Sequence, residues 1–244
     1  MPKARLDALL VTRGLAPSRE KAQAMILAGL VEVDGRRVDK AGSQTGEDAT
    51  ISVAGPAHPF VSRGGVKLAA ALDAFGLDPA GLVCLDVGAS TGGFTDCLLQ
   101  RGAARVYAID VGYGQLDARL RADPRVVLRE KVNARALSEA DVPEAAAFAA
   151  LDLSFISARL VLPAVAARLS PEAAIVVLVK PQFEAGRAEV GKGGIVRSHR
   201  VRARVVQEIE RFATGMGLVS LGSIPAPIKG ARGNQEFLLA VRVP

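Results

Sequence analysis

Two charged residues stand directly after apolar runs in the second half of the chain. Lys180 follows the uncharged run of "IVVLVKPQFE", and Asp152 follows the run in "AALDLSFIS". An ammonium at the end of such a run is costly to bury unless it is paired, so its position needs a reason. If both runs form consecutive parallel strands, their carboxyl ends lie at the same edge of a sheet, where open α/β sheets bind ligands. We therefore expect Asp152 and Lys180 to lie close together at that edge.

A glycine-rich turn follows an earlier apolar run, in "LDVGASTGGFTDCLL". Gly88, Gly92 and Gly93 would let the backbone approach a ligand closely, and Asp86 lies just before the turn. Ser90 occupies the place of the second glycine in the dinucleotide fingerprint G-x-G-x-x-G. The pattern therefore weakens a dinucleotide interpretation and does not exclude it.

A second acidic residue, Asp110, ends the next apolar run, "RVYAID", 24 residues after Asp86. This place suits a carboxylate that accepts hydrogen bonds from a ribose, which nicotinamide cofactors and S-adenosylmethionine both carry. An amino-group methyltransferase would usually have two prolines and an aromatic residue after Asp152, and this sequence lacks them. A cytosine C5-methyltransferase would need a cysteine nucleophile at this edge. Cys84 and Cys97 instead lie inside the expected first strand and the helix after it, where we expect them to be buried.

The elements that must position these residues alternate between apolar strands and helices. The patterns predict strands at 82–87, 105–110, 125–129, 147–152 and 174–180, and helices at 92–101 and 157–169. This alternation indicates a mostly parallel sheet that is covered on both faces. A basic helix is predicted at 198–213, followed by strands at 217–224 and 235–242 with no helix between them. We expect these last two strands to pair antiparallel at one edge of the sheet.

The chain begins with a small module of different character, residues 1–54, which reads as two helices and a hairpin. The dipeptide Asp34-Gly35, flanked by alternating residues in "VEVDGRRV", is the strongest short hairpin signal in the chain. Two prolines and a glycine in "AGPAHPF" then mark a linker, placed at residues 55–62. The remaining residues, 63–244, form the expected α/β domain.

Composition limits the possible partners and location. The 244 residues carry a formal net charge of +6 and a sequence pI near 9.7, which favours an anionic partner such as nucleic acid or an acidic membrane surface. We expect no membrane span, because no apolar run approaches the roughly 20 residues that a spanning helix needs. The amino terminus lacks the apolar core of a signal peptide, so the expected location is the cytoplasm. Two cysteines and two scattered histidines predict no metal site.

Taken together and in order, these motifs resemble the TlyA family of ribosomal RNA 2′-O-methyltransferases over nearly the whole chain. The stretch "RLDALLVTRGLAPSREKAQAMILAGLVEVDG" is similar to the S4-type RNA-binding domain, and "VSRGGVKL", "DVGASTGGFTD", "LDLSFIS", "VKPQFE" and "GNQEFLL" match later blocks of the family. The resemblance implies a Rossmann-like class I methyltransferase. Its seven-stranded, mostly parallel sheet would have an antiparallel edge hairpin, and a small N-terminal α+β RNA-binding domain would precede it. It also implies S-adenosylmethionine as cofactor and a cytidine ribose in ribosomal RNA, or in ribosomal subunits, as substrate.

The family and its FtsJ-like relatives use a Lys-Asp-Lys-Glu tetrad, which the resemblance places on Lys67, Asp152, Lys180 and Glu236. A ribose hydroxyl holds its proton far above neutral pH, and a neutral lysine near the methyl donor could accept that proton. Lys180 is the expected base, and the two carboxylates would orient it and Lys67. The expected cofactor-binding residues are Asp86, Gly88, Ser90, Gly92, Gly93, Asp110 and Asn133, the last of them placed near the adenine by the resemblance.

A basic segment, "GKGGIVRSHRVRAR", contains five lysines and arginines and no acid. On a loop that leads into a helix it could follow RNA phosphates and give salt-dependent affinity; a solvated helix face is the alternative. The small N-terminal module would select a structured target. The expected RNA-binding residues are Arg5, Arg13, Arg19, Lys21, Arg63, Lys192, Arg197 and Arg200.

Three other functions compete with this interpretation. Relatives in this family have often been named haemolysins, but a membrane-damaging protein would need a spanning stretch or a strongly amphipathic membrane helix, and the sequence shows neither. A non-catalytic ribosome-binding factor would not require the intact tetrad. A nicotinamide-dependent reductase would bind NAD and ignore S-adenosylmethionine. The sequence leaves open which nucleotide and which ribosomal subunit would be methylated.

Overall fold

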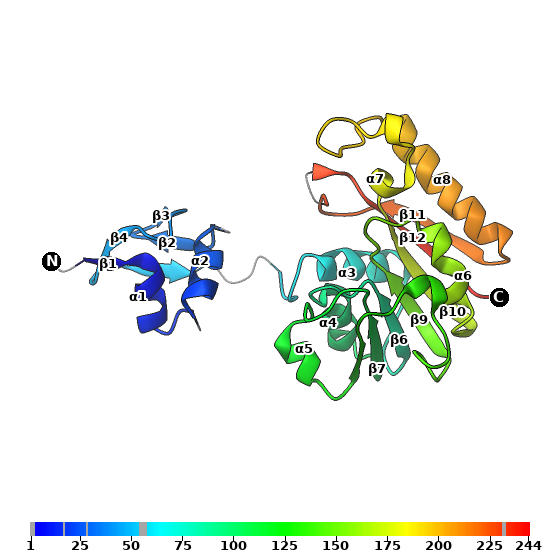
Figure 1. Cartoon of the computed structure of the whole chain (residues 1–244), viewed down its shortest axis with the longest axis horizontal. Coiled ribbons are helices and arrows are strands. Elements are labelled where there is room, and N and C mark those ends of the chain that lie inside the picture. Colours follow the sequence, from blue (N-terminus) through cyan, green and yellow to red (C-terminus); the bar gives the residue numbers. More distant parts are fainter. Residues whose placement is uncertain (1–2, 17, 28, 54–57, 231–232) are drawn as a thin grey trace. The chain divides into compact units, whose positions relative to one another are not determined.

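The computed structural model describes residues 3–16, 18–27, 29–53, 58–230 and 233–244. Its contacts divide the chain into two compact units, Met1–Pro59 and Phe60–Pro244 (Figure 1). The predicted linker, 55–62, falls partly outside the described residues. Its last three residues belong to the second unit, where the backbone N–H of Val61 donates a hydrogen bond to Oδ2 of Asp96 at 2.7 Å.

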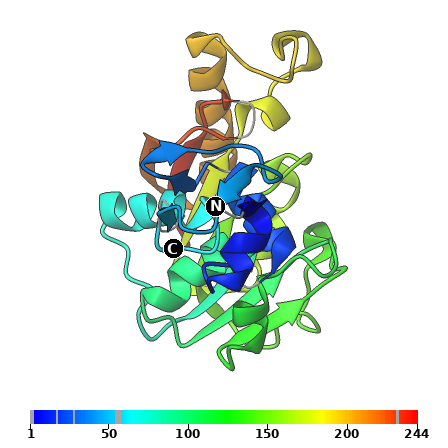
Figure 2. The same ribbon diagram turned by 90° about the vertical axis from the view of Figure 1, so that its left-hand side faces the viewer.

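The first unit, drawn in blue in Figure 1 and Figure 2, contains two helices and five short strands among its described residues. The two predicted helices and the hairpin are present. The hairpin turns at Asp34 and Gly35, whose φ angles of 50° and 72° are the positive values that a two-residue turn of this type needs. The elements are β1 (Lys3–Arg5), α1 (Leu6–Thr12), α2 (Arg19–Leu27), β2 (Val31–Val33), β3 (Arg36–Arg37), β4 (Gln44–Gly46) and β5 (Ile51–Val53).

Three strands of this unit were not predicted. β1 pairs with β4, and β5 pairs with β2 on the side of β2 opposite β3. Each of the three is only three residues long, which is too short to show the period-two alternation by which a strand is recognised. Their pairing is therefore decided by the small core beneath them, where Leu6, Leu10, Ile26 and Val31 are fully buried.

A carboxylate is enclosed in this small unit. Asp7, in the first turn of α1, is completely buried and accepts hydrogen bonds from three side chains: Arg5 at 2.9 and 3.0 Å, Gln23 at 2.8 Å and Arg19 at 3.3 Å. The hydrogen bonds from the Arg5 guanidinium hold the pKa of Asp7 well below its usual range. This ionised carboxyl therefore ties β1 and α2 to α1.

The sheet of the second unit has seven strands among the described residues, in the order β11-β12-β10-β9-β6-β7-β8. β8, β7, β6, β9 and β10 are parallel, whereas β12 is antiparallel to both β10 and β11. This arrangement confirms the predicted mostly parallel sheet with an antiparallel pair at one edge. The strands are β6 (Val83–Val87), β7 (Arg105–Ile109), β8 (Val126–Arg129), β9 (Ala146–Leu151), β10 (Leu169–Val179), β11 (Val219–Pro225) and β12 (Phe237–Arg242).

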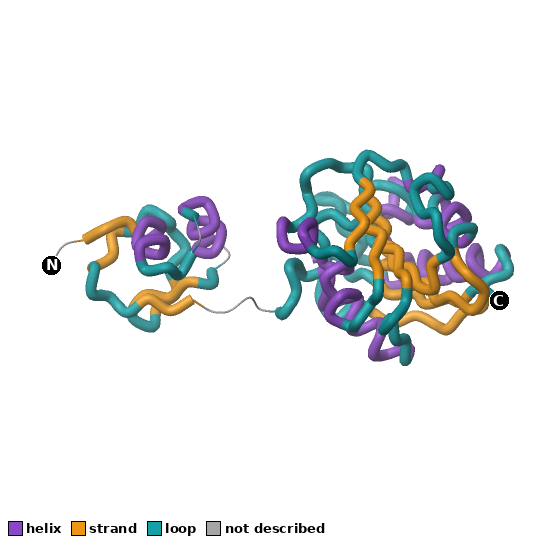
Figure 3. The backbone as a smooth tube through the Cα atoms, turned by 90° about the horizontal axis from the view of Figure 1, so that it is seen from below, coloured by secondary structure: helices purple, strands orange, loops and turns teal. Residues whose placement is uncertain are grey.

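Helices cover both faces of this sheet (Figure 3). Successive strand residues point to opposite faces: Cys84 packs into one core with α3 and α4, and Leu85 packs into the other with α6 and α8. Both faces are apolar because both are covered, as the uncharged strand patterns predicted. Cys84 and Cys97 are buried, as expected, and burial raises the pKa of each thiol to about 12. The helices are α3 (Gly64–Phe75), α4 (Gly93–Gln100), α5 (Ala118–Ala122), α6 (Leu162–Ala166), α7 (Pro181–Glu184) and α8 (His199–Gly215), with 3₁₀ turns η1 (Ala134–Ala136), η2 (Ala158–Leu160) and η3 (Arg187–Glu189).

The substitution Asp7→Asn tests the buried carboxyl of the first unit. We expect it to lower the free energy of unfolding of that unit by about 1–3 kcal/mol, because the arginine donors lose an ionised acceptor. Hydrogen exchange of the α1 amides in the full chain would measure the loss. Glu20→Gln, at an exposed position of α2, is the matched control. Equal exchange in the two variants would show that Asp7 contributes little to stability.

Candidate active site

The carboxyl ends of four parallel strands meet at one edge of the sheet. Val87, Ile109, Leu151 and Val177 are paired in register across β6, β7, β9 and β10. Gly88, Asp110 and Asp152 each come one residue after their strand's paired position, and Lys180 comes three residues after. The sheet thus brings the predicted strand-end residues together, as expected from consecutive parallel strands.

Lys180 and Asp152 form an ion pair at this edge. Nζ of Lys180 lies 2.6 Å from Oδ1 of Asp152 and donates a hydrogen bond to Oγ of Ser154 at 2.9 Å. The Lys180 side chain is only 11% exposed and that of Asp152 is 25% exposed. A nearly buried ammonium is thus paired with a carboxylate at the end of the adjacent strand, as its desolvation requires.

Lys67 and Glu236 form a second and more deeply buried ion pair. Lys67 lies on α3 and Glu236 just before β12, 169 residues further along the chain, and α3 packs against β12. Nζ of Lys67 donates to Oε2 of Glu236 at 2.5 Å, and the side chains are 10% and 2% exposed. Nε2 of Gln182 donates to the other carboxylate oxygen of Glu236 at 3.2 Å. Both oxygens of this buried carboxylate therefore have donors.

The glycine-rich turn passes close to the end of β9. Gly88 has a φ of +87°, and a Cβ there would lie 2.6 Å from the carbonyl oxygen of Asp152, so a side chain cannot be accommodated. Ser90 also has a positive φ, 48°, and its N–H donates to Oδ2 of Asp110 at 2.7 Å. The other oxygen of Asp110 accepts from the N–H of Gly112 at 2.6 Å. The Asp110 carboxylate thus holds the turn in a strained conformation.

Two pockets adjoin at this turn. A pocket of about 490 Å³ is lined by Gly88, Ser90, Asp110 and Asn133 together with apolar residues of the strand ends. A second, of about 220 Å³, is lined by residues that include Arg63, Lys67 and Gly93. Gly88, Ser90 and Asp152 belong to both walls. The arrangement can hold one ligand on each side of the turn, with a carboxylate between them.

Comparison with known proteins agrees with this geometry. The family model of FtsJ-like methyltransferases matches residues 60–243, and that of the S4 domain matches residues 4–51. The "16S/23S rRNA (cytidine-2'-O)-methyltransferase TlyA" of Mycobacterium tuberculosis is 47% identical over 98% of this chain and 90% of its own length. The chain belongs to the TlyA family of FtsJ-like methyltransferases.

Two further relatives carry a different name. "Hemolysin A" of Brachyspira hyodysenteriae is 41% identical over 96% of this chain and 98% of its own length. A solved structure from Streptococcus thermophilus, also under a hemolysin name, has a TM-score of 0.78 at 43% identity and covers 100% of this chain and 89% of its own. The resemblance that the motifs carried is thus confirmed, including the haemolysin-like names within the family.

The larger pocket fits the cofactor of this family, S-adenosylmethionine. Gly88 leaves room for a ligand to approach the backbone, and Ile109, Val132 and Val161 supply apolar wall for a nucleoside. Asp110 still has carboxylate lone pairs for ribose hydroxyls beyond its two backbone bonds. The anionic groups at the rim favour a ligand whose reacting centre is a cation.

Two residues predicted to bind the cofactor make contacts with neighbouring elements of the fold. Among the described residues, Asp86 and Gly92 belong to neither pocket wall. Asp86 is fully buried and accepts hydrogen bonds from the N–H and Oγ1 of Thr95 at 2.8 and 2.6 Å. A Cβ on Gly92 would lie 2.3 Å from Cδ1 of Leu120. The structure thus gives both residues contacts that hold the turn against α4 and α5.

Some residues at the edge were not predicted. Ser154 and Gln182 each lie two residues beyond a predicted charged residue, Asp152 and Lys180. Ser154 bonds to Lys180 and Gln182 bonds to Glu236. Their presence inside the motifs "LDLSFIS" and "VKPQFE" was visible. Their contacts were not, because a serine or glutamine after a strand carries no distinctive spacing.

The basic residues predicted to bind RNA differ in their surroundings. Lys21, Lys192, Arg197 and Arg200 are exposed, and so is Arg63, at the start of α3. Arg5 and Arg19 are paired with Asp7 but remain about half exposed, at 48% and 58%. Arg13 donates to the carbonyls of Glu47 and Ala49. Within the basic segment, Arg202 and Arg204 bond within the second unit.

The described part of the chain lacks both a membrane-spanning helix and a cluster of metal-binding side chains. Its helices include none with the length and apolar character needed to cross a membrane. Its His, Cys, Asp and Glu side chains include no group of three or more placed to hold a metal ion.

Asp86→Asn tests the buried carboxyl behind the glycine turn. Desolvation raises the pKa of Asp86 from 3.8 to about 7, so the folded protein keeps a proton that the unfolded chain has lost. This group therefore makes the protein less stable as the pH rises from about 4, near the pKa of the unfolded chain, to about 7, the pKa in the folded protein. We expect the Tm of the wild type to fall more steeply over this range than that of Asp86→Asn.

Thermal unfolding at several pH values would measure this difference. Asp73→Asn, at an exposed position of α3, is the matched control and should follow the wild type. Parallel curves for the wild type and Asp86→Asn would contradict the assignment of the raised pKa to Asp86.

Proposed function

We propose that this chain methylates the ribose 2′-hydroxyl of a cytidine in ribosomal RNA, using Lys67, Asp152, Lys180 and Glu236. The observation that carries the proposal is the Lys180–Asp152 ion pair at the edge of the sheet, with Asp152 in the walls of both pockets. The carboxylate that would orient the base thus lies where a cofactor and a second ligand would meet, and the base is paired with it. The Mycobacterium tuberculosis relative, named as a ribosomal RNA cytidine-2'-O-methyltransferase, supports the choice of cytidine and of its 2′-hydroxyl.

Lys180 acts in this proposal as the general base. S-adenosylmethionine, when bound, supplies an electrophilic methyl group. The ammonium of Lys180 must first release a proton to solvent. The neutral amine then takes the proton of the 2′-hydroxyl as that oxygen becomes nucleophilic, and Asp152 holds the Nζ atom in place and stabilises the ammonium that forms again. Ser154 accepts a further hydrogen bond from the same Nζ atom and restricts its direction. Correct positioning for in-line attack supplies much of the remaining acceleration.

The second pair serves to place Lys67. Its ammonium lines the smaller pocket, and Glu236 holds it there from a position that is almost fully buried. A fixed cation at this place can donate hydrogen bonds to substrate oxygens around the reacting hydroxyl. Gly230 packs directly against the Glu236 carboxylate, where a Cβ would lie 2.0 Å from Oε1, so backbone closes that side of the pair.

In this proposal two parts of the chain bind RNA. One is residues 1–54, an S4-type domain, and the other is the set of exposed cations on the catalytic domain, residues 63–244. The linker joins these two domains. Lys192, Arg197 and Arg200 lie exposed on the loop before α8 and at its start. Such cations bind phosphates without reading sequence and make affinity salt-dependent. Arg63, in the wall of the smaller pocket, would hold a phosphate close to the reacting ribose. For a ribosomal RNA substrate we predict a cytoplasmic location.

The function is tested by incubating the purified protein and labelled S-adenosylmethionine with small and large ribosomal subunits. We expect label in ribosomal RNA of at least one subunit, in a dinucleotide that resists alkaline hydrolysis, because 2′-O-methylation removes the hydroxyl that attacks the phosphodiester. Measurable cofactor binding without transfer to either subunit would instead favour a non-catalytic binding factor or another RNA.

The role of Lys180 is tested by Lys180→Ala and Lys180→Arg. We expect both to lower kcat by about 10²- to 10⁴-fold, because neither alanine nor a guanidinium that stays protonated can take the proton. Cofactor affinity, measured by calorimetry, should stay nearly unchanged in both. Substantial activity in Lys180→Arg alone would show that a cation beside Asp152 suffices, and an equal loss of binding and transfer would show that Lys180 binds the cofactor.

A further inference from the structure

The Gln182 side chain has one amide end attached to the tetrad. Its Nε2 atom donates to Oε1 of Glu236 at 3.2 Å, and the opposite oxygen of Glu236 accepts from Lys67. A carboxylate paired with a lysine is ionised and can only accept hydrogen bonds, so the amide nitrogen of Gln182, not its oxygen, must face it. Glu236 therefore determines which way the Gln182 amide is turned.

The other end of this amide lacks a partner. Oε1 of Gln182 is buried, and no residue that the structure describes donates a hydrogen bond to it. Buried side-chain acceptors in folded proteins are nearly always satisfied, and an exception calls for an explanation. A donor from a bound ligand would satisfy this oxygen if binding of the ligand uncovered it toward an adjoining pocket.

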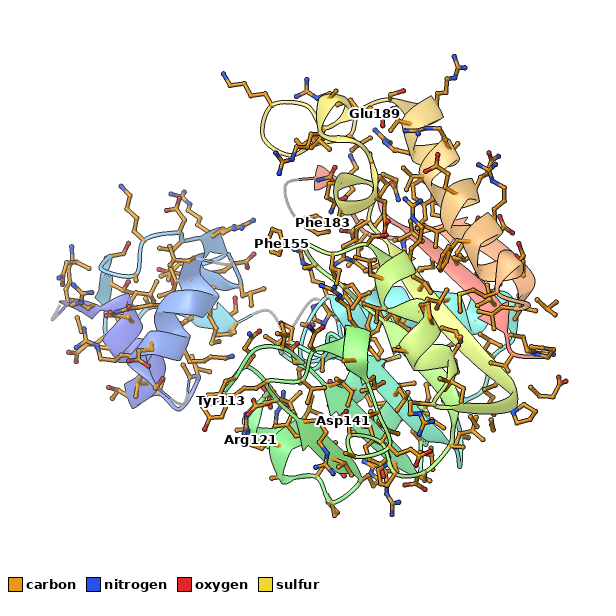
Figure 4. All side chains as sticks on the ribbon, turned by 45° about the vertical axis from the view of Figure 1, so that its right-hand side comes forward. Tyr113, Arg121, Asp141, Phe155, Phe183 and Glu189 are labelled. Atoms are coloured by element: carbon orange, nitrogen blue, oxygen red, sulfur yellow. The ribbon has the colours of Figure 1, made fainter. Side chains whose placement is uncertain are left out.

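Gln182 also lines a pocket beside the reaction centre. The pocket has a volume of about 480 Å³, and its wall includes Gln182, Phe155 and Phe183. The two rings lie with centroids 4.9 Å apart, next to each other in Figure 4, and Phe155 also belongs to the wall of the cofactor pocket. Nζ of Lys180 is 5.9 Å from the centroid of the Phe183 ring. Lys180 does not itself line this pocket, but its Nζ lies beside the Phe183 ring, one of the pocket's aromatic walls.

We propose that Oε1 of Gln182 accepts a hydrogen bond from the exocyclic amine of the target cytosine and thereby selects cytidine over uridine. The inference rests on the proposed function, since it concerns the base whose ribose is methylated. Cytosine carries an amine donor at the position where uracil carries a carbonyl acceptor. With the amide turned by Glu236, uracil would place its carbonyl oxygen against Oε1. A site built around a buried acceptor rejects a base that leaves the acceptor unpaired.

A purely structural role for Gln182 makes a different prediction. If Gln182 only holds Glu236 in place, its removal weakens the Lys67–Glu236 arrangement and slows transfer to every base alike. The ratio of kcat/KM for two bases would then stay constant, whatever the absolute rate. This ratio therefore distinguishes two roles of Gln182, recognition of the target base and support of Glu236.

The test uses ribosomal RNA that carries cytidine, uridine or pyrimidin-2-one riboside at the position that takes label, assembled into the accepting subunit. Pyrimidin-2-one has the shape of cytosine without its exocyclic amine. We expect the wild type to prefer cytidine over either analogue by about 10- to 100-fold in kcat/KM. Gln182→Met should bring both ratios to within a few-fold of one, because the variant has no amide to bond the amine.

Gln235→Met is the matched control. The Gln235 amide nitrogen donates to the backbone carbonyls of Ala226 and Glu236, so its loss perturbs the same segment without touching the Gln182 oxygen. Its ratios should equal those of the wild type. Unchanged discrimination in Gln182→Met would overturn the proposal.

A wild type that methylates the pyrimidin-2-one and cytidine substrates equally would also overturn it, and this arm does not depend on a variant that folds. A wild type that transfers no methyl to the cytidine substrate would instead refute the proposed function itself.

Discussion

The pairing of two nearly buried lysines with two carboxylates is the interaction on which the site depends. Taking an ammonium out of water is favourable only where an opposite charge meets it with good geometry. Lys180 meets Asp152 across neighbouring strand ends, whereas Lys67 meets Glu236 across 169 residues of chain. The first pair therefore requires the parallel register of β9 and β10, and the second requires α3 to pack against β12. A fold that lost either packing would leave a buried charge without its partner.

The glycine turn connects these charges to the cofactor pocket. Gly88 lies against the carbonyl of Asp152, and Asp110 holds the following residues by accepting from two backbone N–H groups. The carboxylate of Asp152 is thus placed between the two pockets by the same contacts that shape the turn. Asp86 supports the turn from behind through Thr95, in an environment dry enough to favour the protonated form of its carboxyl. One short segment of chain, the glycine turn with its supporting contacts, therefore both positions the Asp152 carboxylate and encloses the Asp86 carboxyl in dry surroundings.

Recognition is divided among surfaces with different chemistry. Exposed cations around α8 and on the first unit suit an anionic backbone, to which they bind without regard to sequence. Base identity needs a group whose hydrogen-bonding direction is fixed, and such groups must be held by neighbours. Gln182 is held by Glu236, so the residue that orients Lys67 also sets the direction of a free acceptor. In the proposed mechanism, one buried carboxylate would thus serve both catalytic geometry and base specificity.

Much of the fold could be predicted from sequence because its signals are local. The seven strands of the α/β domain and its helices α4 and α8 were predicted from sequence patterns, whereas α3, which carries Lys67, was not predicted. Asp152 and Lys180 were placed at one edge because consecutive parallel strands end on the same side. The order of the motifs identified the family, and with it Lys67 and Glu236, before any contact between them was visible. Strands of three residues, such as β1 and β4, gave no such signal, since their pairing depends on the core beneath them.

Only the tertiary structure decided where several of these side chains point. Both faces of the sheet are buried, so sequence could not tell that Asp86 turns inward to Thr95 while Asp110, at the end of the next strand, reaches the pocket. The amide of Gln182 is likewise oriented by a carboxylate distant in the chain. The sequence by itself determined the longer strands of the α/β domain and the chemical groups that stand at their ends. Long-range packing alone decided which of those groups meet, because burial of a charge or an amide depends on partners that the local sequence does not contain.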